Sequence, residues 1–233
     1  MNGPDLHSSS PPRSVPFTPI SRMRARAELA RDDSDTSYFF ELLYLGEMVI
    51  KVLAVEVLAG LEQDRERHRY TIEHRLVRAG GIGDWAAALD EALTGPASQH
   101  FVTGALASRS ALTQAFGPAE KSWQRRAVDS LSDACVCIDA AFEDLSKVKV
   151  TARQWVRQFA WLRNRTRGHG APKGETLSTV CPALEASIDE VVGNAPAFGR
   201  SWAYLRRNLS GKYRVSSFGA LRCIEWITQR QAM

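Results

Sequence analysis

The residues best suited to chemistry lie in one short stretch, residues 161–170, where arginines, an asparagine and a histidine follow one another. His169 stands between two glycines, so we expect it on a bare turn that a ligand can approach closely. Histidine transfers protons near neutral pH, and the planar guanidinium of Arg163 suits a phosphoryl group. The amide of Asn164 can hold a substrate hydroxyl or orient the histidine. A base, an acid and a group that stabilises phosphoryl charge are what cleavage of a phosphodiester by a neighbouring 2′-hydroxyl requires.

The pair Arg163-Asn164, followed by four further residues and then His169, resembles the motif of the HEPN family (higher eukaryotes and prokaryotes nucleotide-binding domains). The resemblance covers the motif and the general architecture of about residues 36–233. It implies a metal-independent endoribonuclease that uses no cofactor and cleaves RNA by 2′-hydroxyl transesterification, with Arg163, Asn164 and His169 as catalytic residues. It also implies a homodimer that acts in a toxin–antitoxin or antiviral defence system, with an antitoxin or partner subunit.

The charge of the chain is unevenly distributed. The net charge is +4, but residues 1–144 hold 15 basic and 21 acidic side chains, whereas residues 145–233 hold 15 basic and 5 acidic ones. No acidic residue occurs between Asp144 and Glu175. Such a block attracts a polyanion whatever its sequence, so we expect a nucleic acid or nucleotide as the ligand, although a solvated basic face is the plainer alternative. The family resemblance implies that this ligand is RNA. The expected phosphate-binding residues are Arg153, Arg157, Arg165, Arg167 and Lys173.

A second stretch also matches the motif, since Arg67 is followed by His68 and later by His74. Acidic residues surround it, which makes a poor setting for a phosphate. The two histidines are six residues apart and do not share a helical face, so we interpret them as surface side chains rather than metal ligands. The stretch before His169 itself also fits a simple basic helix end closed by a glycine turn.

One histidine per chain supplies one proton-transfer group, whereas acid–base cleavage needs two. Pairing two copies across a two-fold axis would bring both copies of His169 and Arg163 into one cleft, so we expect a homodimer with a composite site. The main alternative is a non-catalytic HEPN-type helical subunit that mediates dimerisation or senses nucleotides within a larger system. A DNA-binding regulator is a third, but no helix-turn-helix with a basic recognition helix can be placed.

The hydrophobic pattern predicts an all-α fold, with a disordered tail over residues 1–34 and one HEPN-like helical bundle over residues 35–233. The capping-box spacing from Thr151 to Gln154 starts the helix that carries the motif and buries Trp155, Phe159 and Leu162. Only residues 213–215 look extended. The other predicted helices cover residues 38–61, 62–79, 84–93, 98–116, 118–145, 177–192, 196–208 and 218–228.

Two further features bear on location. Four cysteines follow no metal-ligand pattern, so we expect reduced, mostly buried thiols, no metal site and a cytoplasmic protein. No secretory signal is visible, and the first twenty residues hold five of the ten prolines. The most apolar stretch, residues 44–61, is interrupted by Glu47, Lys51 and Glu56, which favours a buried core helix over a membrane span.

Overall fold

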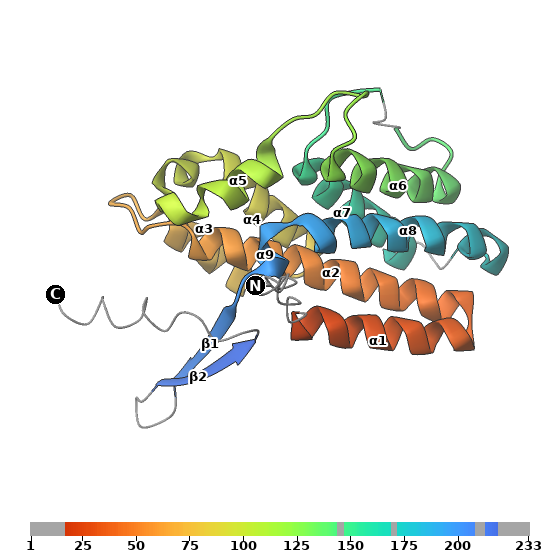
Figure 1. Cartoon of the computed structure of the whole chain (residues 1–233), viewed down its shortest axis with the longest axis horizontal. Helices are drawn as coiled ribbons and strands as arrows, with labels where there is room; N and C mark the ends of the chain where they lie inside the picture. Colours follow the sequence, from red (N-terminus) through yellow and green to blue (C-terminus); the bar gives the residue numbers. More distant parts are fainter. Residues whose placement is uncertain (1–16, 144–146, 169–171, 208–212, 219–233) are drawn as a thin grey trace, which may run out of the picture. The chain divides into compact units, whose positions relative to one another are not determined.

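Helices make up most of the structure, a computed structural model, and this confirms the predicted all-α class (Figure 1). The structure describes residues 17–143, 147–168, 172–207 and 213–218. The chain forms two compact units, one of residues 19–198 and one of residues 1–18 together with 199–233. None of the described helices is long and apolar enough to cross a membrane.

The larger unit holds the helices. They are α1 (Thr18–Asp33), α2 (Asp35–Ala59), α3 (His68–Val77), α4 (Ile82–Thr94), the 3-10 helices η1 (Pro96–His100) and η2 (Thr103–Ala105), α5 (Leu106–Thr113), α6 (Trp123–Ile138), α7 (Ala152–Gly168), α8 (Gly174–Asn194) and α9 (Pro196–Gly199).

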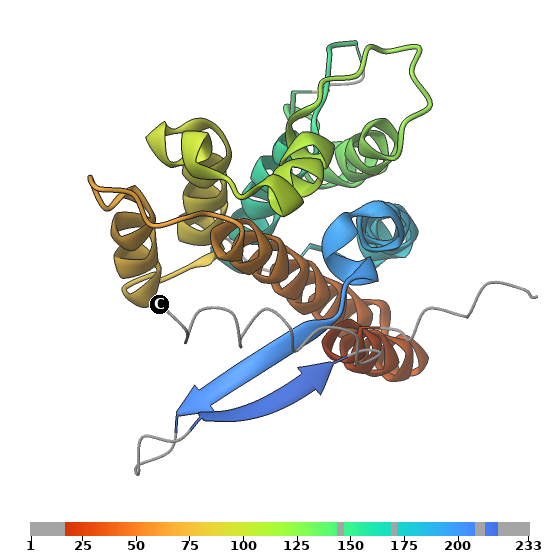
Figure 2. The ribbon, with the colours of Figure 1, turned by 60° about the vertical axis from the view of Figure 1, so that its left-hand side comes forward.

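Helix α2 is the central element of this unit and packs against α4, α7 and α8 (Figures 1 and 2). It begins where Ser34 caps it, because the Ser34 hydroxyl accepts a hydrogen bond from the Ser37 N–H at 3.1 Å. Its apolar residues run around most of the helix, and even Glu56 is buried and accepts a hydrogen bond from Ser108 at 3.0 Å. A helix that is apolar on most sides belongs inside a bundle, as the sequence predicted.

Helix α7 begins where the capping box predicted it, because the Thr151 N–H donates to Gln154 Oε1 at 2.5 Å. Trp155 and Phe159 are fully buried and stack with ring centroids 5.3 Å apart. The indole N–H of Trp155 donates to the Ser187 hydroxyl of α8 at 2.7 Å, and that hydroxyl donates to the Ala127 carbonyl of α6 at 2.7 Å. This chain of hydrogen bonds fixes α7 against two neighbouring helices and so positions the end that carries the motif.

Helices α2 and α7 approach closely at Gly46. A Cβ atom at this position would overlap the ring of Phe159, so only glycine lets the two helices pack as they do. Glycine within a helix normally costs about 1 kcal/mol relative to alanine, and here the close approach explains why it is kept.

The smaller unit contains a two-stranded antiparallel sheet of β1 (Trp202–Arg207) and β2 (Tyr213–Phe218), with Trp202 opposite Phe218. The predicted helix over residues 196–208 is therefore wrong after Gly199, because aromatic residues at alternate positions, Trp202 and Tyr204, favour a strand. The extended conformation predicted for residues 213–215 is confirmed. Residues 219–228, where a helix was predicted, lie outside the described residues.

Other boundaries also differ from the prediction, and the helix predicted over residues 118–145 is shorter, running from Trp123 to Ile138. Residues 18–33, assigned to the tail from composition, form α1, while residues 1–16 lie outside the described residues. The helix predicted over residues 62–79 starts only at His68, because Arg67 adopts a left-handed conformation with φ 62°. The segment 98–116 is divided among η1, η2 and α5.

Candidate functional site

The motif residues that the structure describes lie near the end of α7. Arg163 is partly exposed, and its Nε donates to Glu47 Oε1 of α2 at 2.7 Å. Its Nη1 lies 3.4 Å from Oδ1 of the neighbouring Asn164, which is exposed. The ion pair with Glu47 of α2 therefore fixes the orientation of the Arg163 guanidinium. Glycine at 168 ends α7, and His169, the third motif residue, lies outside the described residues.

Glu47 is shared by three cations. Its side chain is only 12% exposed, and Arg167 and Lys51 each approach one of its oxygens at 3.8 Å in addition to Arg163. Arg167 also donates to the Tyr44 hydroxyl at 3.2 Å, with its guanidinium carbon 5.1 Å from the centre of that ring. One carboxylate thus faces three positive charges. The excess of positive charge around Glu47 favours the binding of an anion beside this cluster.

A pocket of about 380 Å³ opens between α1 and α2 beside these arginines. It is linked to them through Tyr44 and Glu47, which line it and also contact α7. Cations, an aromatic ring and thioethers together suit a nucleotide, because a base can stack or pack while its phosphate meets the charges. The lining residues are Met23, Arg26, Tyr44, Glu47, Met48 and Lys51.

This pocket is not among the features expected from the sequence. The signal that identifies it is helical spacing, since Tyr44, Glu47, Met48 and Lys51 recur at intervals of three and four residues along one face of α2. In the sequence, Glu47 and Lys51 stand out only as charges that interrupt an apolar stretch. Their connection to the motif depends on α7, which lies more than a hundred residues away in the sequence.

Asn164 faces the start of α4. Its Nδ2 lies 4.0 Å from the position that a Cβ on Gly83 would take. The α4 start is rich in glycine, and Asp84 closes it by accepting hydrogen bonds from the N–H groups of Gly80 and Gly81 at 2.8 and 3.1 Å. Asn164 therefore lies where bare backbone can be approached closely by a ligand.

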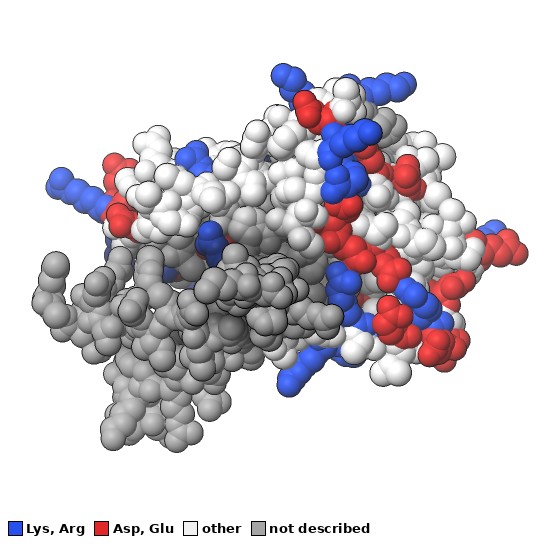
Figure 3. Space-filling view, viewed as in Figure 1, with Lys and Arg blue, Asp and Glu red and all other residues white. Residues whose placement is uncertain are grey.

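The predicted phosphate-binding arginines lie near acidic side chains in space. Arg153 and Arg157 both bind Asp90 of α4, Arg157 at 2.7 Å, and Arg165 lies 3.2 Å from Asp139. The block that lacks acidic residues in the sequence therefore has acidic neighbours in three dimensions, because distant segments supply the carboxylates. Figure 3 likewise shows basic and acidic side chains interspersed on one face of the molecule. Lys173 is exposed at the start of α8 and has no acidic partner among the described residues.

Asp90 connects α4 to α7 through both arginines. Desolvation alone would raise the pKa of this carboxyl, but hydrogen bonds and charge from Arg157 and Arg153 outweigh it and hold the pKa below its ordinary value. A carboxyl whose pKa is lowered by folding stabilises the protein above its unfolded-state pKa of about 3.9, and loses that contribution as the pH falls through the folded-state pKa.

We therefore expect Asp90→Asn to lower the free energy of unfolding by roughly 1 kcal/mol at pH 7, because both arginines lose their partner. The difference from the wild type should shrink as the pH falls from about 4 through the lowered folded-state pKa, below which Asp90 is protonated in both states. Urea unfolding at several pH values measures it. Asp133→Asn, on exposed α6 surface without an ion pair among the described residues, is the matched control. If the loss of unfolding free energy in Asp90→Asn did not change with pH, the conclusion that the two arginines lower the pKa of Asp90 would be contradicted.

Two described cysteines are unsuited to nucleophilic chemistry. Cys135 and Cys181 are buried, and burial raises the pKa of each thiol to about 12. Thiolates, the reactive form, are therefore scarce at neutral pH, as expected for packing residues.

No family model, no curated protein and no solved structure matches this chain.

Proposed function

We propose that this protein is a metal-independent endoribonuclease of the HEPN kind. The observation that carries the proposal is the arrangement near the end of α7, where Arg163 is oriented by Glu47 and stands beside the exposed Asn164, five residues before Gly168 ends the helix. The pocket beside Tyr44 supports it, since it offers a place for a nucleotide next to the motif.

In the proposed reaction, one His169 takes the proton from a ribose 2′-hydroxyl as its oxygen attacks the adjacent phosphorus. Arg163 stabilises the charge that develops on the phosphoryl oxygens, and Asn164 orients the reacting groups. The bond from phosphorus to the 5′-oxygen breaks, and a second histidine gives that oxygen a proton. The products are a 2′,3′-cyclic phosphate and a 5′-hydroxyl.

A homodimer supplies the second histidine, because two copies of His169 would share one composite cleft. Arg165, Arg167 and Lys173 are proposed to hold the RNA backbone. Arg153 and Arg157 can contribute only by exchanging Asp90 for a phosphate, since they bind that carboxylate in the free protein. A protein that sediments as a monomer at micromolar concentration yet is fully active would exclude the composite site.

The test is cleavage of total RNA by the purified full chain in the presence of EDTA. We expect cleavage at the rate seen without chelator, with fragments ending in 2′,3′-cyclic phosphate and 5′-hydroxyl. Analysis of the fragment ends by mass spectrometry identifies the products. Intact RNA at high protein concentration, or cleavage that EDTA removes, would exclude the proposed reaction.

One observation favours a second candidate, a non-catalytic HEPN-type subunit that mediates dimerisation or senses nucleotides. Glu47 already neutralises Arg163 and ties α2 to α7, which is a sufficient structural role for the arginine. Cleavage by the wild type distinguishes the two candidates. A sensing subunit binds RNA or nucleotides without cutting them, and it keeps that binding when His169 is replaced.

A further inference from the structure

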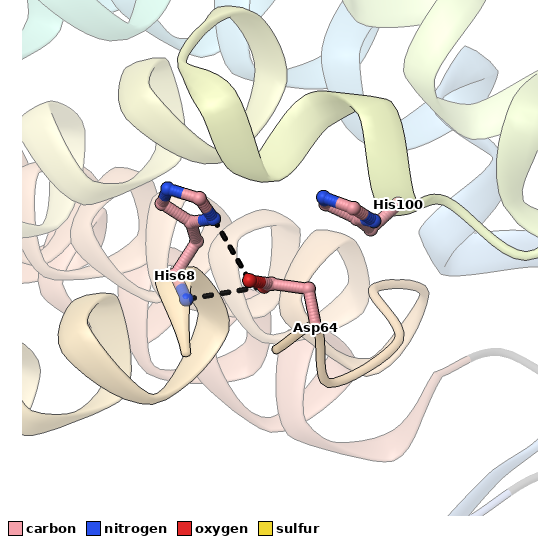
Figure 4. Close-up of side chains that lie close together, drawn as sticks. All are labelled: Asp64, His68 and His100. Atoms are coloured by element: carbon pink, nitrogen blue, oxygen red, sulfur yellow. Dashed lines mark hydrogen bonds and ion pairs between the residues drawn. The ribbon is translucent and has the colours of Figure 1, made fainter. Parts of the chain in front are cut away.

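Three potential metal ligands lie together at a different place in the larger unit (Figure 4). Asp64 belongs to the connection between α2 and α3, His68 is the first residue of α3, and His100 is the last residue of η1. One ligand atom from each lies within 4.8 Å of the other two. The two histidines are 32 positions apart in the sequence, so no local spacing pattern reveals the cluster.

Backbone hydrogen bonds hold the two segments side by side. The Glu62 N–H donates to the His100 carbonyl at 2.8 Å, and the Val102 N–H donates to the Gly60 carbonyl at 2.9 Å. The fold itself therefore brings the three potential metal ligands together before any ion binds.

The Asp64 carboxylate is held in a fixed orientation. Its Oδ1 accepts from the Glu66 N–H at 2.8 Å, and its Oδ2 accepts from the His68 N–H at 3.1 Å. Its side chain is only 5% exposed, and Oδ1 lies 2.9 Å from His68 Nδ1. A carboxylate oxygen and an imidazole nitrogen are thus held next to each other.

We propose that Asp64, His68 and His100 form a binding site for a divalent transition-metal ion of the Zn²⁺ class. Two imidazoles and one carboxylate are a ligand set that such ions prefer, with water free to complete the coordination. Ligands at about 2.1 Å from a metal lie roughly 3.0–3.4 Å apart, which matches the separation of Oδ1 and Nδ1. A side-chain movement of about 1–2 Å brings His100 to the same spacing.

The surroundings of His68 support this assignment. Its other nitrogen, Nε2, lies 3.3 Å from a carboxylate oxygen of Glu66. Metal-binding histidines characteristically donate their second N–H to a carboxylate, which fixes the tautomer and leaves the opposite nitrogen free for the ion. The ion would connect η1 to the start of α3. None of the motif residues takes part, so this site is independent of RNA cleavage.

The test is titration of metal-free, tag-free full-length protein with Zn²⁺ by isothermal calorimetry, because a polyhistidine tag would itself bind the ion. We expect one ion per chain and a higher Tm with Zn²⁺ than with EDTA, since binding to the folded state alone stabilises it. His100→Ala should weaken Zn²⁺ binding by at least about tenfold. Co²⁺ in place of Zn²⁺ gives a visible absorption band that reports the coordination directly.

His74→Ala is the matched control, since His74 lies on the same helix but stacks on Tyr70 with ring centroids 6.0 Å apart. It should bind Zn²⁺ like the wild type. Asp64→Asn provides a second variant, because it removes the charge while its amide oxygen can still accept one of the two backbone hydrogen bonds. Absence of Zn²⁺ binding by the wild type, or equal affinity in wild type and His100→Ala, would overturn the proposal. Circular dichroism establishes that each variant is folded.

Discussion

Replacing His169 with alanine is expected to abolish RNA cleavage while leaving RNA binding largely intact. General acid–base groups contribute typically about 10²–10⁴-fold to the rate, and in a composite dimer site a single substitution removes both of them at once. The cations around Glu47 and Asp90 are untouched by the change, so the affinity for the RNA backbone remains. Cleavage of a fluorescent RNA in EDTA measures the rate, and fluorescence anisotropy measures binding.

His74→Ala is the control for this experiment as well, because His74 belongs to the second match to the motif. It should cleave at the wild-type rate. A His169→Ala protein that cleaves as fast as the wild type would end the assignment of this motif as catalytic. Loss of both cleavage and binding, in a protein that is still folded, would place His169 in RNA recognition instead.

Gly46→Ala is expected to destabilise the protein by about 3 kcal/mol or more, against the usual gain of about 1 kcal/mol for alanine in a helix. The added methyl group overlaps the ring of Phe159, which is itself fully buried. That ring cannot retreat easily, because it stacks on Trp155 and the indole of Trp155 is hydrogen-bonded to Ser187. Urea unfolding followed by circular dichroism measures the loss.

Two further variants make this prediction specific. Gly193→Ala, near the end of α8 with open space around it, should keep or raise the stability. Combining Gly46→Ala with Phe159→Leu should cost less than the sum of the single changes, because the smaller side chain makes room for the methyl group. If the losses of unfolding free energy simply add in the double variant, the clash with Phe159 is not the cause of the Gly46→Ala effect.

Much of the helical scaffold could be predicted because its signals are local. Thr151 and Gln154 mark the start of α7, and the spacing of Trp155 and Phe159 identifies its buried face. The sheet could not be predicted in the same way, since the pairing of Trp202 with Phe218 depends on contacts between two segments. Helix α1 was missed because its composition is that of a polar tail, whereas ion pairs such as Arg26 with Glu41 hold it against α2.

The candidate site was predictable only in part. Arg163 and Asn164 stand out from their neighbours in the sequence, and the structure places both near the exposed end of a helix. The carboxylates that neutralise the basic block come from α2, α4 and the end of α6, so no count of charges along the chain reveals them. Charge distribution in sequence therefore overstated how basic this surface is in space.

The fit between α2 and α7 also constrains how the chain can change over time. The backbone of one helix is seated against an aromatic ring of the other, so position 46 tolerates a larger residue only when position 159 holds a smaller one. These positions lie 113 residues apart in the sequence (159 minus 46). Among proteins that share this packing, they are expected to covary, and a glycine paired with a distant phenylalanine becomes a signature by which divergent relatives can be recognised.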